Sequence, residues 1–345
     1  MIFASFRDGE GCKSYIVGCE ETLAAAVIDP ALGLVDRYVG ELGKQGLRLR
    51  YIIDTHTHAD HFSGARALRQ ACGAPIVMHR LSPAPYVDLH VEGGHSLPLG
   101  SMRMRILHTP GHTRDSISIH VDDRVFTGDT LLIGGTGRSD LPSGDPDRLF
   151  DSLFATLLAL PDKTLVFPAH DYKGRDSSTI GDERIGNPRL AKTERTDFVA
   201  LMNNLNLTAP THLTEALRTN MSDGKTVQQL LAEASARVPF MAMDELDRRT
   251  SERANDFVII DVRERDAFAA GHVTGALHLP RGQLELRVNE VLPDPGVEIV
   301  TICEFGKIST LAAATLRELG FQRAVALDGG MAAWRKAGKV VQTET

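Results

Sequence analysis

The sequence predicts an α/β protein built from two domains, and three observations support this. The chain has 345 residues, more than one typical domain holds. In both halves, segments with the apolar pattern of strands alternate with segments that have the period of helices. Near residue 240 an apolar, proline-containing connection gives way to a new strand-like run. We therefore expect one domain over residues 1–239 and a smaller one over residues 240–345.

The expected strands of the first domain are short runs that are continuously apolar or alternate between polar and apolar residues. They lie at residues 14–18, 24–30, 49–56, 75–79, 102–110, 116–129 and 164–170. Helices are expected between them, at residues 32–46, 62–73 and 145–160. In the last helix Asp145 is a candidate N-cap and Pro146 takes the first helical position, where its missing N–H is tolerated.

The second domain continues the alternation of strands and helices over about 100 residues, a normal domain size. Its strand-like runs begin at residues 256, 276, 297 and 323, with helical segments between them. We expect a second, smaller α/β unit.

Composition narrows the possible partners and compartments. The net charge is −7 and no dense Lys/Arg run is present, so neither nucleic acid nor an anionic membrane is an expected partner. We find no signal-peptide pattern and no apolar stretch near the roughly 20 residues that span a bilayer. The four cysteines form no disulfide framework, which favours a reducing cytoplasm. We expect Cys12, Cys19 and Cys72 to be small buried or half-buried residues.

Metal-binding residue types gather at the ends of the predicted strands, most densely in "THTHADH" (55–61). Imidazole and carboxylate groups suit Zn²⁺, Fe²⁺ or Mn²⁺. On an extended or looping chain after a strand, His56 and His58 point to the same side, and Asp60 and His61 can turn to a neighbouring point. The full set of candidates is His56, His58, Asp60, His61, His112, Asp129 and His170. So many candidates at strand ends predict a metal site.

The HxHxDH motif, followed in order by His112, Asp129 and His170, resembles the metallo-β-lactamase superfamily over residues 1–235. The resemblance implies an αββα sandwich with metals at the strand ends. Many members of that superfamily bind two zinc ions and hydrolyse a thioester, lactone or lactam with a bridging hydroxide. In that arrangement one ion would be held by His56, His58 and His112, the other by Asp60, His61 and His170, and Asp129 would bridge.

Other segments resemble the persulfide dioxygenase branch of that superfamily, namely "FTGDTLLIGGTGRSD", "FPAHDYKG", "NPRL" (187–190) and "FVALMNNLNLTAP" (198–210). This resemblance implies one Fe(II) per chain, held by His56, His112 and Asp129, with three positions open for persulfide and O₂. The remaining candidates would then orient these ligands by hydrogen bonds. They are His58, Asp60, His61 and His170.

The same resemblance implies that Arg138, Tyr172 and Arg189 contact glutathione. Arginine suits the carboxylates of that peptide because its planar fork can bind them bidentately. The alternative for each arginine is an ordinary surface or inter-loop ion pair. The family also implies a homodimer.

Cys303 lies where a predicted strand ends and a helix begins. A thiol there faces free backbone N–H groups, which favour the thiolate and can cradle an anion. The alternative is a buried strand cysteine. The surrounding "VIIDVRERDAFAAGHVTGALHLP" and "ALDGGMAAWRKAG" resemble a rhodanese domain over residues 240–345. That resemblance makes Cys303 a sulfur-carrying nucleophile and Asp261, Arg263, His272, His278 and Trp334 framework residues.

The loop after Cys303 departs from the rhodanese pattern. Glu304 follows directly, Ile308 stands where an arginine is frequent, and Lys307 is the only positive side chain left in the loop. We therefore expect Lys307 to contact the substrate. Because a carboxylate beside the thiol disfavours thiolate and repels a dianion, thiosulfate is an unfavourable donor. A persulfide donor or a partner protein fits this loop equally well.

These resemblances imply an enzyme that oxidises glutathione persulfide with O₂ to sulfite and glutathione and moves sulfane sulfur through Cys303, and the composition favours a cytoplasmic location. Thiosulfate or another sulfane-sulfur compound is a further expected partner. The alternative is a di-zinc thioester hydrolase of the glyoxalase II type, joined to a non-catalytic rhodanese module that senses sulfur species.

Overall fold

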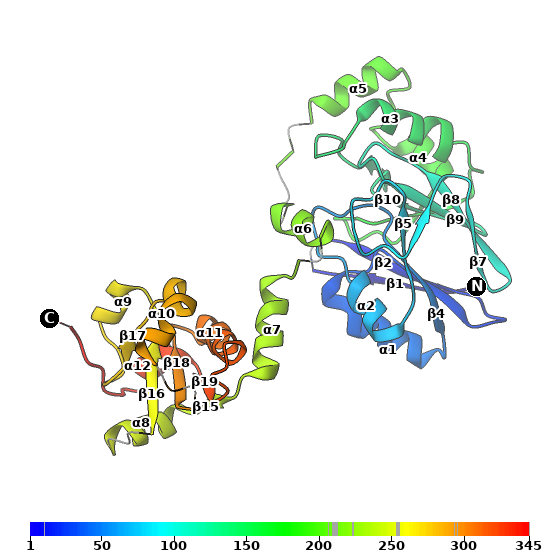
Figure 1. Cartoon of the computed structure of the whole chain (residues 1–345). Helices are drawn as coiled ribbons and strands as arrows, with labels where there is room; N and C mark the ends of the chain where they lie inside the picture. Colours follow the sequence, from blue (N-terminus) through cyan, green and yellow to red (C-terminus); the bar gives the residue numbers. More distant parts are fainter. Residues whose placement is uncertain are drawn as a thin grey trace. The chain divides into compact units, whose positions relative to one another are not determined.

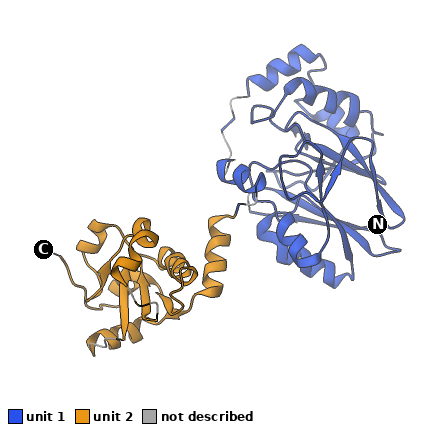
Figure 2. Cartoon of the chain, viewed as in Figure 1, with its two compact units in different colours: residues 1–224 blue, residues 225–345 orange. Residues whose placement is uncertain are grey.

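The computed structural model describes residues 1–9, 11–205, 207–208, 213–222, 224–252, 256–292, 294 and 296–344. The chain forms two compact units, residues 1–224 and 225–345 (Figure 2). Helix α7 (Val227–Arg237) belongs to the second unit. The boundary between residues 239 and 240 stays a prediction, and part of the segment 198–210 lies outside the described residues.

The first unit contains two six-stranded sheets (Figure 1). In sheet order the first contains β1 (Ile2–Arg7), β2 (Lys13–Gly18), β3 (Ala24–Ile28), β4 (Arg48–Ile53), β5 (Ile76–His79) and β6 (Leu89–Val91). The second contains β14 (Ser178–Thr179), β13 (Leu165–Pro168), β10 (Arg124–Gly128), β9 (Ile117–Val121), β8 (Met102–His108) and β7 (Ser96–Leu99). A separate two-stranded ribbon joins β11 (Leu131–Leu132) to β12 (Gly135–Thr136).

The two sheets pack face to face around a shared apolar core. Tyr15 and Val17 of β2 lie in one buried cluster with Ile106 and Phe126 of the second sheet. Ile16 points the other way and joins the cluster beneath the helices that cover the first sheet, as the alternation of side chains along a strand requires. The expected αββα sandwich is therefore confirmed.

Helices cover the outer face of each sheet. The first sheet is covered by α1 (Val35–Lys44), which follows the 3₁₀ turn η1 (Leu32–Leu34), and by α2 (Ala65–Cys72). The second is covered by α3 (Pro146–Asp151), η2 (Ser152–Leu157), α4 (Ile180–Gly186) and α5 (Arg195–Asn203). Helix α6 (Leu213–Asn220) completes the unit.

The helix expected over residues 145–160 forms with one difference. Asp145 is the N-cap, because its side chain accepts hydrogen bonds from the N–H groups of Asp147 and Arg148, and Pro146 holds the first position as predicted. After α3, however, the chain continues as the π-helical turn η2. At this junction the Ser152 hydroxyl donates a hydrogen bond to the Pro110 carbonyl at 2.6 Å.

The second unit is a parallel five-stranded sheet with helices on both faces. In sheet order its strands are β15 (Phe240–Met241), β19 (Ala324–Leu327), β18 (Glu298–Ile302), β16 (Phe257–Asp261) and β17 (Leu277–His278). Its other helices are α8 (Met243–Ser251), α9 (Arg265–Ala269), η3 (Arg281–Gln283), α10 (Leu284–Val291), α11 (Lys307–Glu318) and α12 (Gly330–Lys336). Ile260 packs in the core beneath α10 and α11, whereas Ile259 faces α8 and α12. The predicted second α/β unit is confirmed.

Two further expectations can be compared with the fold. Across the part of the chain that the structure describes, no helix is long and apolar enough to cross a membrane. Cys12 and Cys19 are buried as predicted, but Cys72 is exposed, so the prediction for Cys72 was wrong. Cys72 is the last residue of α2 and is followed by Gly73 in a left-handed conformation, so its side chain sits at the solvent-facing helix end.

Candidate metal centre

The predicted metal-binding residues lie on loops that follow strands β4, β8, β10 and β13. They divide into three separate groups, and within each group the possible ligand atoms are within 4.8 Å of one another. The groups are His56, His112 and Asp129, then Cys12, Asp60, His61 and His170, then Asp29, Asp54 and His58. The structure thus brings together every predicted ligand, but not around one point.

The first group has the composition expected for a site with two histidines and one carboxylate. The Nε2 atoms of His56 and His112 lie 4.0 and 3.7 Å from Asp129 Oδ2. All three side chains are buried. Burial, together with the neighbouring His58 and His112, lowers the pKa of His56 to about 3, so this imidazole is neutral and able to bind a metal.

Hydrogen bonds orient both imidazoles of this group. His112 Nδ1 donates to the carbonyl of Arg138 at 2.7 Å. His56 Nδ1 lies 3.0 Å from Thr55 Oγ1, which itself donates to Asp29. Both Nδ1 atoms therefore carry the hydrogen, and the lone pair is on Nε2. His56 Nε2 is buried without a hydrogen-bond partner, which is the arrangement that a metal ligand needs.

Gly128 allows Asp129 to approach the histidine loop. Its φ is +52°, and a Cβ atom at this position would lie 2.5 Å from Thr55 Oγ1. A larger residue would collide with the threonine that orients His56. Although burial raises the pKa of Asp129, the charge and the hydrogen bond of His170 lower it overall, so the carboxylate is ionised.

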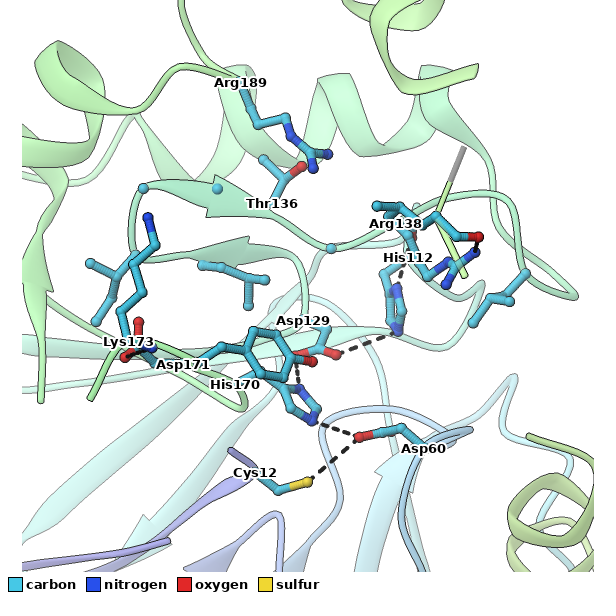
Figure 3. Close-up of a pocket in the computed structure, with 18 of the residues that line it drawn as sticks. Cys12, Asp60, His112, Asp129, Thr136, Arg138, His170, Asp171, Lys173 and Arg189 are labelled. Carbon is cyan, nitrogen blue, oxygen red and sulfur yellow. Dashed lines mark hydrogen bonds and ion pairs between the residues drawn. The ribbon is translucent and has the colours of Figure 1, made fainter. Parts of the chain in front are cut away.

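The second group is centred on Asp60 and His170. His170 forms ion pairs with Asp60 at 2.6 Å and with Asp129 at 2.7 Å, one from each ring nitrogen (Figure 3). Burial disfavours the charged ring, but the two carboxylates raise the pKa of His170 well above its ordinary value. His170 therefore links the second group to the carboxylate of the first.

Cys12 belongs to this second group, which the sequence did not indicate. Its Sγ lies 3.6 Å from Asp60 Oδ2, and its backbone pairs with that of His170. The two residues are far apart in the sequence, so only the fold brings them together. The prediction of a small buried cysteine was correct but omitted this position beside the site.

His58 belongs to the third group and His56 to the first, although their ring centroids are only 4.2 Å apart. His58 Nε2 lies 3.2 Å from Asp29 Oδ1 and 3.9 Å from Asp54 Oδ1. Burial lowers the pKa of His58 well below its ordinary value and raises that of Asp54 to about 7. The segment forms an irregular loop, in which the two histidines turn toward different partners and not to the same side as predicted.

A pocket of about 530 Å³ opens over the first two groups (Figure 3). His112, Asp129 and His170 lie on its floor, and Arg138, Tyr172 and Arg189 contribute to its walls. Lys173 and Arg175 also line it, and the sequence did not single them out. The pocket is large enough for a small peptide-like ligand.

The guanidinium of Arg138 already has hydrogen-bond partners within the protein. It makes two hydrogen bonds to Asp140, at 2.6 and 2.7 Å, and donates to the carbonyls of Leu207 and Thr208. An ordinary ion pair, weighed as the alternative for this residue, is therefore present within its own loop. Its backbone carbonyl meanwhile holds His112.

Arg189 and Tyr172 are less constrained. Within the described ranges no carboxylate forms an ion pair with Arg189, and burial lowers its pKa. Tyr172 stacks on His170 with ring centroids 5.8 Å apart, and 76% of its surface is exposed. Asp171 fixes the loop that carries Tyr172, because its carboxylate accepts hydrogen bonds from the side chain and backbone of Arg175.

In the second unit Cys303 directly follows β18 and precedes α11. Its side chain is buried, and Sγ lies 3.3 Å from Ser309 Oγ. The framework residues have structural contacts. Asp261 and Arg263 form a buried ion pair at 2.7 Å, His272 Nδ1 bonds to Phe268 O, His278 Nε2 to Arg263 O, and Trp334 Nε1 to Val340 O.

The charge around the Cys303 loop differs from the prediction. Glu304 is paired with Arg263 at 3.2 Å and also with Arg335. The exposed Lys307 is thus not the only cation at this loop, and Glu304 is not an unbalanced charge beside the thiol. The pairing of Glu304 could not be predicted from the sequence, because Arg263 and Arg335 lie 41 and 31 residues away along the chain.

Comparisons with known proteins agree with this architecture. Residues 7–170 match the model of the metallo-beta-lactamase superfamily, and residues 242–337 match that of the rhodanese-like domain. The human mitochondrial persulfide dioxygenase ETHE1 is 39% identical over 214 residues, covering 61% of this chain and 84% of that protein. The hydroxyacylglutathione hydrolase of Anaeromyxobacter dehalogenans is 35% identical over 173 residues, covering 50% of this chain and 66% of that enzyme.

Among solved structures, the crystal structure of ETHE1 from Myxococcus xanthus has a TM-score of 0.63 and 42% sequence identity. It covers 65% of this chain, and this chain covers all of it. The predicted resemblances are confirmed, and the superfamily implies a metal at the site described above. The chain belongs to the persulfide dioxygenase family of the metallo-β-lactamase superfamily and carries a rhodanese domain in its C-terminal part.

Proposed function

We propose that the first unit oxidises glutathione persulfide with O₂ at a single Fe(II), and that Cys303 transfers sulfane sulfur from the same pool. The balanced reaction is GSSH + O₂ + H₂O → GSH + HSO₃⁻ + H⁺, in which the outer sulfur loses four electrons to O₂. The observation that carries this proposal is the separation of His56, His112 and Asp129 from the other candidate ligands.

The donor set fits iron. Two imidazoles and one carboxylate converge, and the Nε2 atom of His56 is buried without a hydrogen-bond partner. Fe(II) held by His56, His112 and Asp129 would bind persulfide and O₂ side by side and exchange electrons with them. In the second candidate group His170 Nδ1 is hydrogen-bonded to Asp129, while Nε2 lies 2.6 Å from Asp60 Oδ2 and has no hydrogen-bond partner. That engagement supports a positioning role for His170.

The pocket wall offers contacts for the glutathione body. Arg189 has a guanidinium without an acidic partner among the described residues, so it can pair with a substrate carboxylate. Tyr172 can contact the same ligand from the rim. Arg138, held by Asp140, contributes by fixing the wall and the His112 ring. A direct contact of Arg138 with glutathione remains a prediction, as do the homodimer and the cytoplasmic location.

Cys303 would accept the outer sulfur of a persulfide by thiol exchange, GSSH + Cys303–SH → GSH + Cys303–SSH. The match of residues 242–337 to the rhodanese-like domain supports this role. In the alternative, the second unit senses sulfur species without turnover. A Cys303 persulfide that forms on mixing with glutathione persulfide, and is absent in Cys303→Ser, contradicts that alternative when measured by mass spectrometry.

A di-zinc thioester hydrolase is the second candidate function. Asp60, His61 and His170 lie together as a second zinc would require, and a hydroxyacylglutathione hydrolase is 35% identical over 173 residues. His61 Nε2 is also buried without a hydrogen-bond partner. These contacts support a two-metal site as the alternative hypothesis to be tested.

Two variants distinguish the candidates. With one iron, His56→Ala removes a ligand and abolishes O₂ uptake on glutathione persulfide, whereas His61→Ala keeps a substantial part of it. Iron content per chain, measured on the same samples, should fall only in His56→Ala. Equal loss of activity and of metal in both variants would support two coupled metal sites instead.

A further inference from the structure

The carboxylate of Glu304 sits between two guanidinium groups. Arg263 Nη1 lies 3.2 Å from one oxygen, and Arg335 pairs with the other. Arg263 is 6% exposed and cannot swing away, because it also bonds to Asp261 and to the carbonyl of Gly271. Arg335 is 44% exposed. The two arginines thus define a position for an anion, and the chain's own carboxylate occupies it.

This anion position belongs to the Cys303 loop. Glu304 is the next residue after Cys303, with Cα atoms about 3.8 Å apart. Helix α12, which carries Arg335, is tied to the loop because Met331 N and Ala332 N donate to the carbonyls of Cys303 and Glu304, each at 2.9 Å. Arg335 is therefore held beside the loop by the backbone as well as by its own ion pair.

We propose that Glu304 is a specificity-determining residue that acts by occupying Arg263 and Arg335, so that neither arginine is free to bind an anionic donor at Cys303. The inference rests on the proposed sulfur transfer by Cys303. Thiosulfate, a compact dianion, must displace Glu304 to be bound. An organic persulfide needs no such cation, and its body can contact Phe305 and Ile308, which are 70% and 50% exposed beside the thiol.

The chemistry separates the two donors. Thiosulfate would react as S₂O₃²⁻ + Cys303–S⁻ → Cys303–SS⁻ + SO₃²⁻, in which one S–S bond breaks, another forms and a dianion leaves. A bound cation stabilises both the entering and the leaving dianion. A glutathione persulfide releases a thiol in the same exchange, so it depends less on Arg335. Occupation of the arginines thus selects the persulfide.

Simple repulsion by Glu304 would also disfavour thiosulfate, and a double variant separates the two explanations. Occupation predicts that Glu304→Gln raises kcat/KM for thiosulfate, with cyanide as acceptor, by about 10-fold or more, since charge-assisted bonds to the freed arginine become available. In Glu304→Gln with Arg335→Ala this gain should disappear. Repulsion alone predicts that the gain survives in the double variant.

Two more variants keep the test decisive. Arg335→Ala alone should leave thiosulfate turnover within about twofold of the parent, because Glu304 already occupies that arginine; a large loss would overturn the proposal even if Glu304→Gln does not fold. Glu318→Gln removes a comparable exposed pair with Arg237, at 3.0 Å, and should change nothing.

The persulfide reaction is followed in the same variants. Formation of Cys303–SSH from glutathione persulfide, measured by mass spectrometry, should change less than twofold in Glu304→Gln. If the parent forms no such persulfide, the proposed sulfur transfer fails. If it forms the persulfide but Glu304→Gln gains no thiosulfate activity, only the role of Glu304 is contradicted.

Discussion

At the scale of single residues, groups outside the proposed ligand set orient the members of that set. The Arg138 carbonyl and Thr55 hydroxyl fix the hydrogen on the Nδ1 atoms of His112 and His56, which leaves Nε2 free. His170 Nδ1 lies 2.7 Å from Asp129 Oδ1 and fixes that carboxylate. Such outer contacts commonly change metal affinity by about 10- to 100-fold when they are removed.

Arg189 provides the first residue-scale prediction. Because its guanidinium has no acidic partner in the described part of the chain, Arg189→Ala removes a charge-assisted contact to glutathione and little of the fold. We expect KM for glutathione persulfide to rise by roughly 10-fold or more, with kcat within about threefold. Steady-state O₂ uptake checks this. Arg184→Ala is the control, since Arg184 pairs with Asp162 on the surface; an unchanged KM in Arg189→Ala would contradict the assignment.

His79 gives a pH-dependent prediction. Burial and the stacked His108, 4.0 Å away, lower the pKa of His79 to about 4. An unfolded chain has a histidine pKa near 6.5, so it binds more protons than the folded state between pH 6.5 and 4. The contribution of His79 to the free energy of unfolding is therefore fully present above pH 6.5. It decreases by about 1–3 kcal/mol as the pH falls toward 4.

His79→Gln should remove this part of the acid destabilisation. The measurement is the free energy of unfolding by urea at pH 7.5 and pH 5. The difference between the two pH values should be smaller in His79→Gln than in the parent, whereas His90→Gln, at an exposed position, should retain it. An equal pH dependence in all three proteins would contradict the assigned pKa shift.

Residue types and their spacing placed the candidate ligands at the strand ends, and the resemblance to the persulfide dioxygenases selected three of them. His56, His112 and Asp129 were predicted as a set, and they form one group. The direction of His58 was not predictable, because it depends on an irregular loop that offers Asp29 as a partner. Cys12 and Arg335 were missed because their contacts join segments that are distant in the sequence.

At the scale of elements, the loop that carries His112 is packed directly on α3. Gly111 has φ +138°, and a Cβ atom there would lie 2.3–2.4 Å from the backbone of Leu149. Gly111 also accepts the backbone hydrogen bond from Asp145, the N-cap of α3, at 2.9 Å. The helix start and the metal ligand are thus held by the same glycine.

Gly111→Ala should therefore destabilise the protein and displace His112. We expect a loss of about 3 kcal/mol or more in the free energy of unfolding and a reduced iron content per chain. The control is Gly94→Ala, where φ is also positive (+90°) but no atom lies within 4 Å of the new Cβ, so only the conformational cost of about 1 kcal/mol applies. Equal losses in both variants would show that packing on α3 is unimportant.

Elements with strong local signals were predicted well. The apolar runs became β4, β10, β13, β16 and β18, and Asp145 caps α3. The edge strands β6 and β7 and the two-residue strands β11, β12, β14 and β15 were not predicted, because their short or exposed segments follow neighbouring strands rather than a pattern of their own. The change to η2 likewise depends on the contact between Ser152 and Pro110.

At the scale of the whole molecule, each unit has its own apolar core and its own candidate site. Cys303→Ser should therefore abolish sulfur transfer yet leave O₂ uptake on glutathione persulfide within about twofold of the parent. Both rates are measured on the full chain. A large loss of O₂ uptake in Cys303→Ser would mean that sulfur passes through the rhodanese unit before it is oxidised.

The central claim is that one iron, and not two zinc ions, serves the first unit. It is tested most directly by metal analysis of the full chain purified without added metal, paired with O₂ uptake on glutathione persulfide. The account predicts close to one iron per chain and O₂ consumption that depends on persulfide. Two zinc ions per chain with no O₂ uptake would contradict it and make thioesters the substrates to examine.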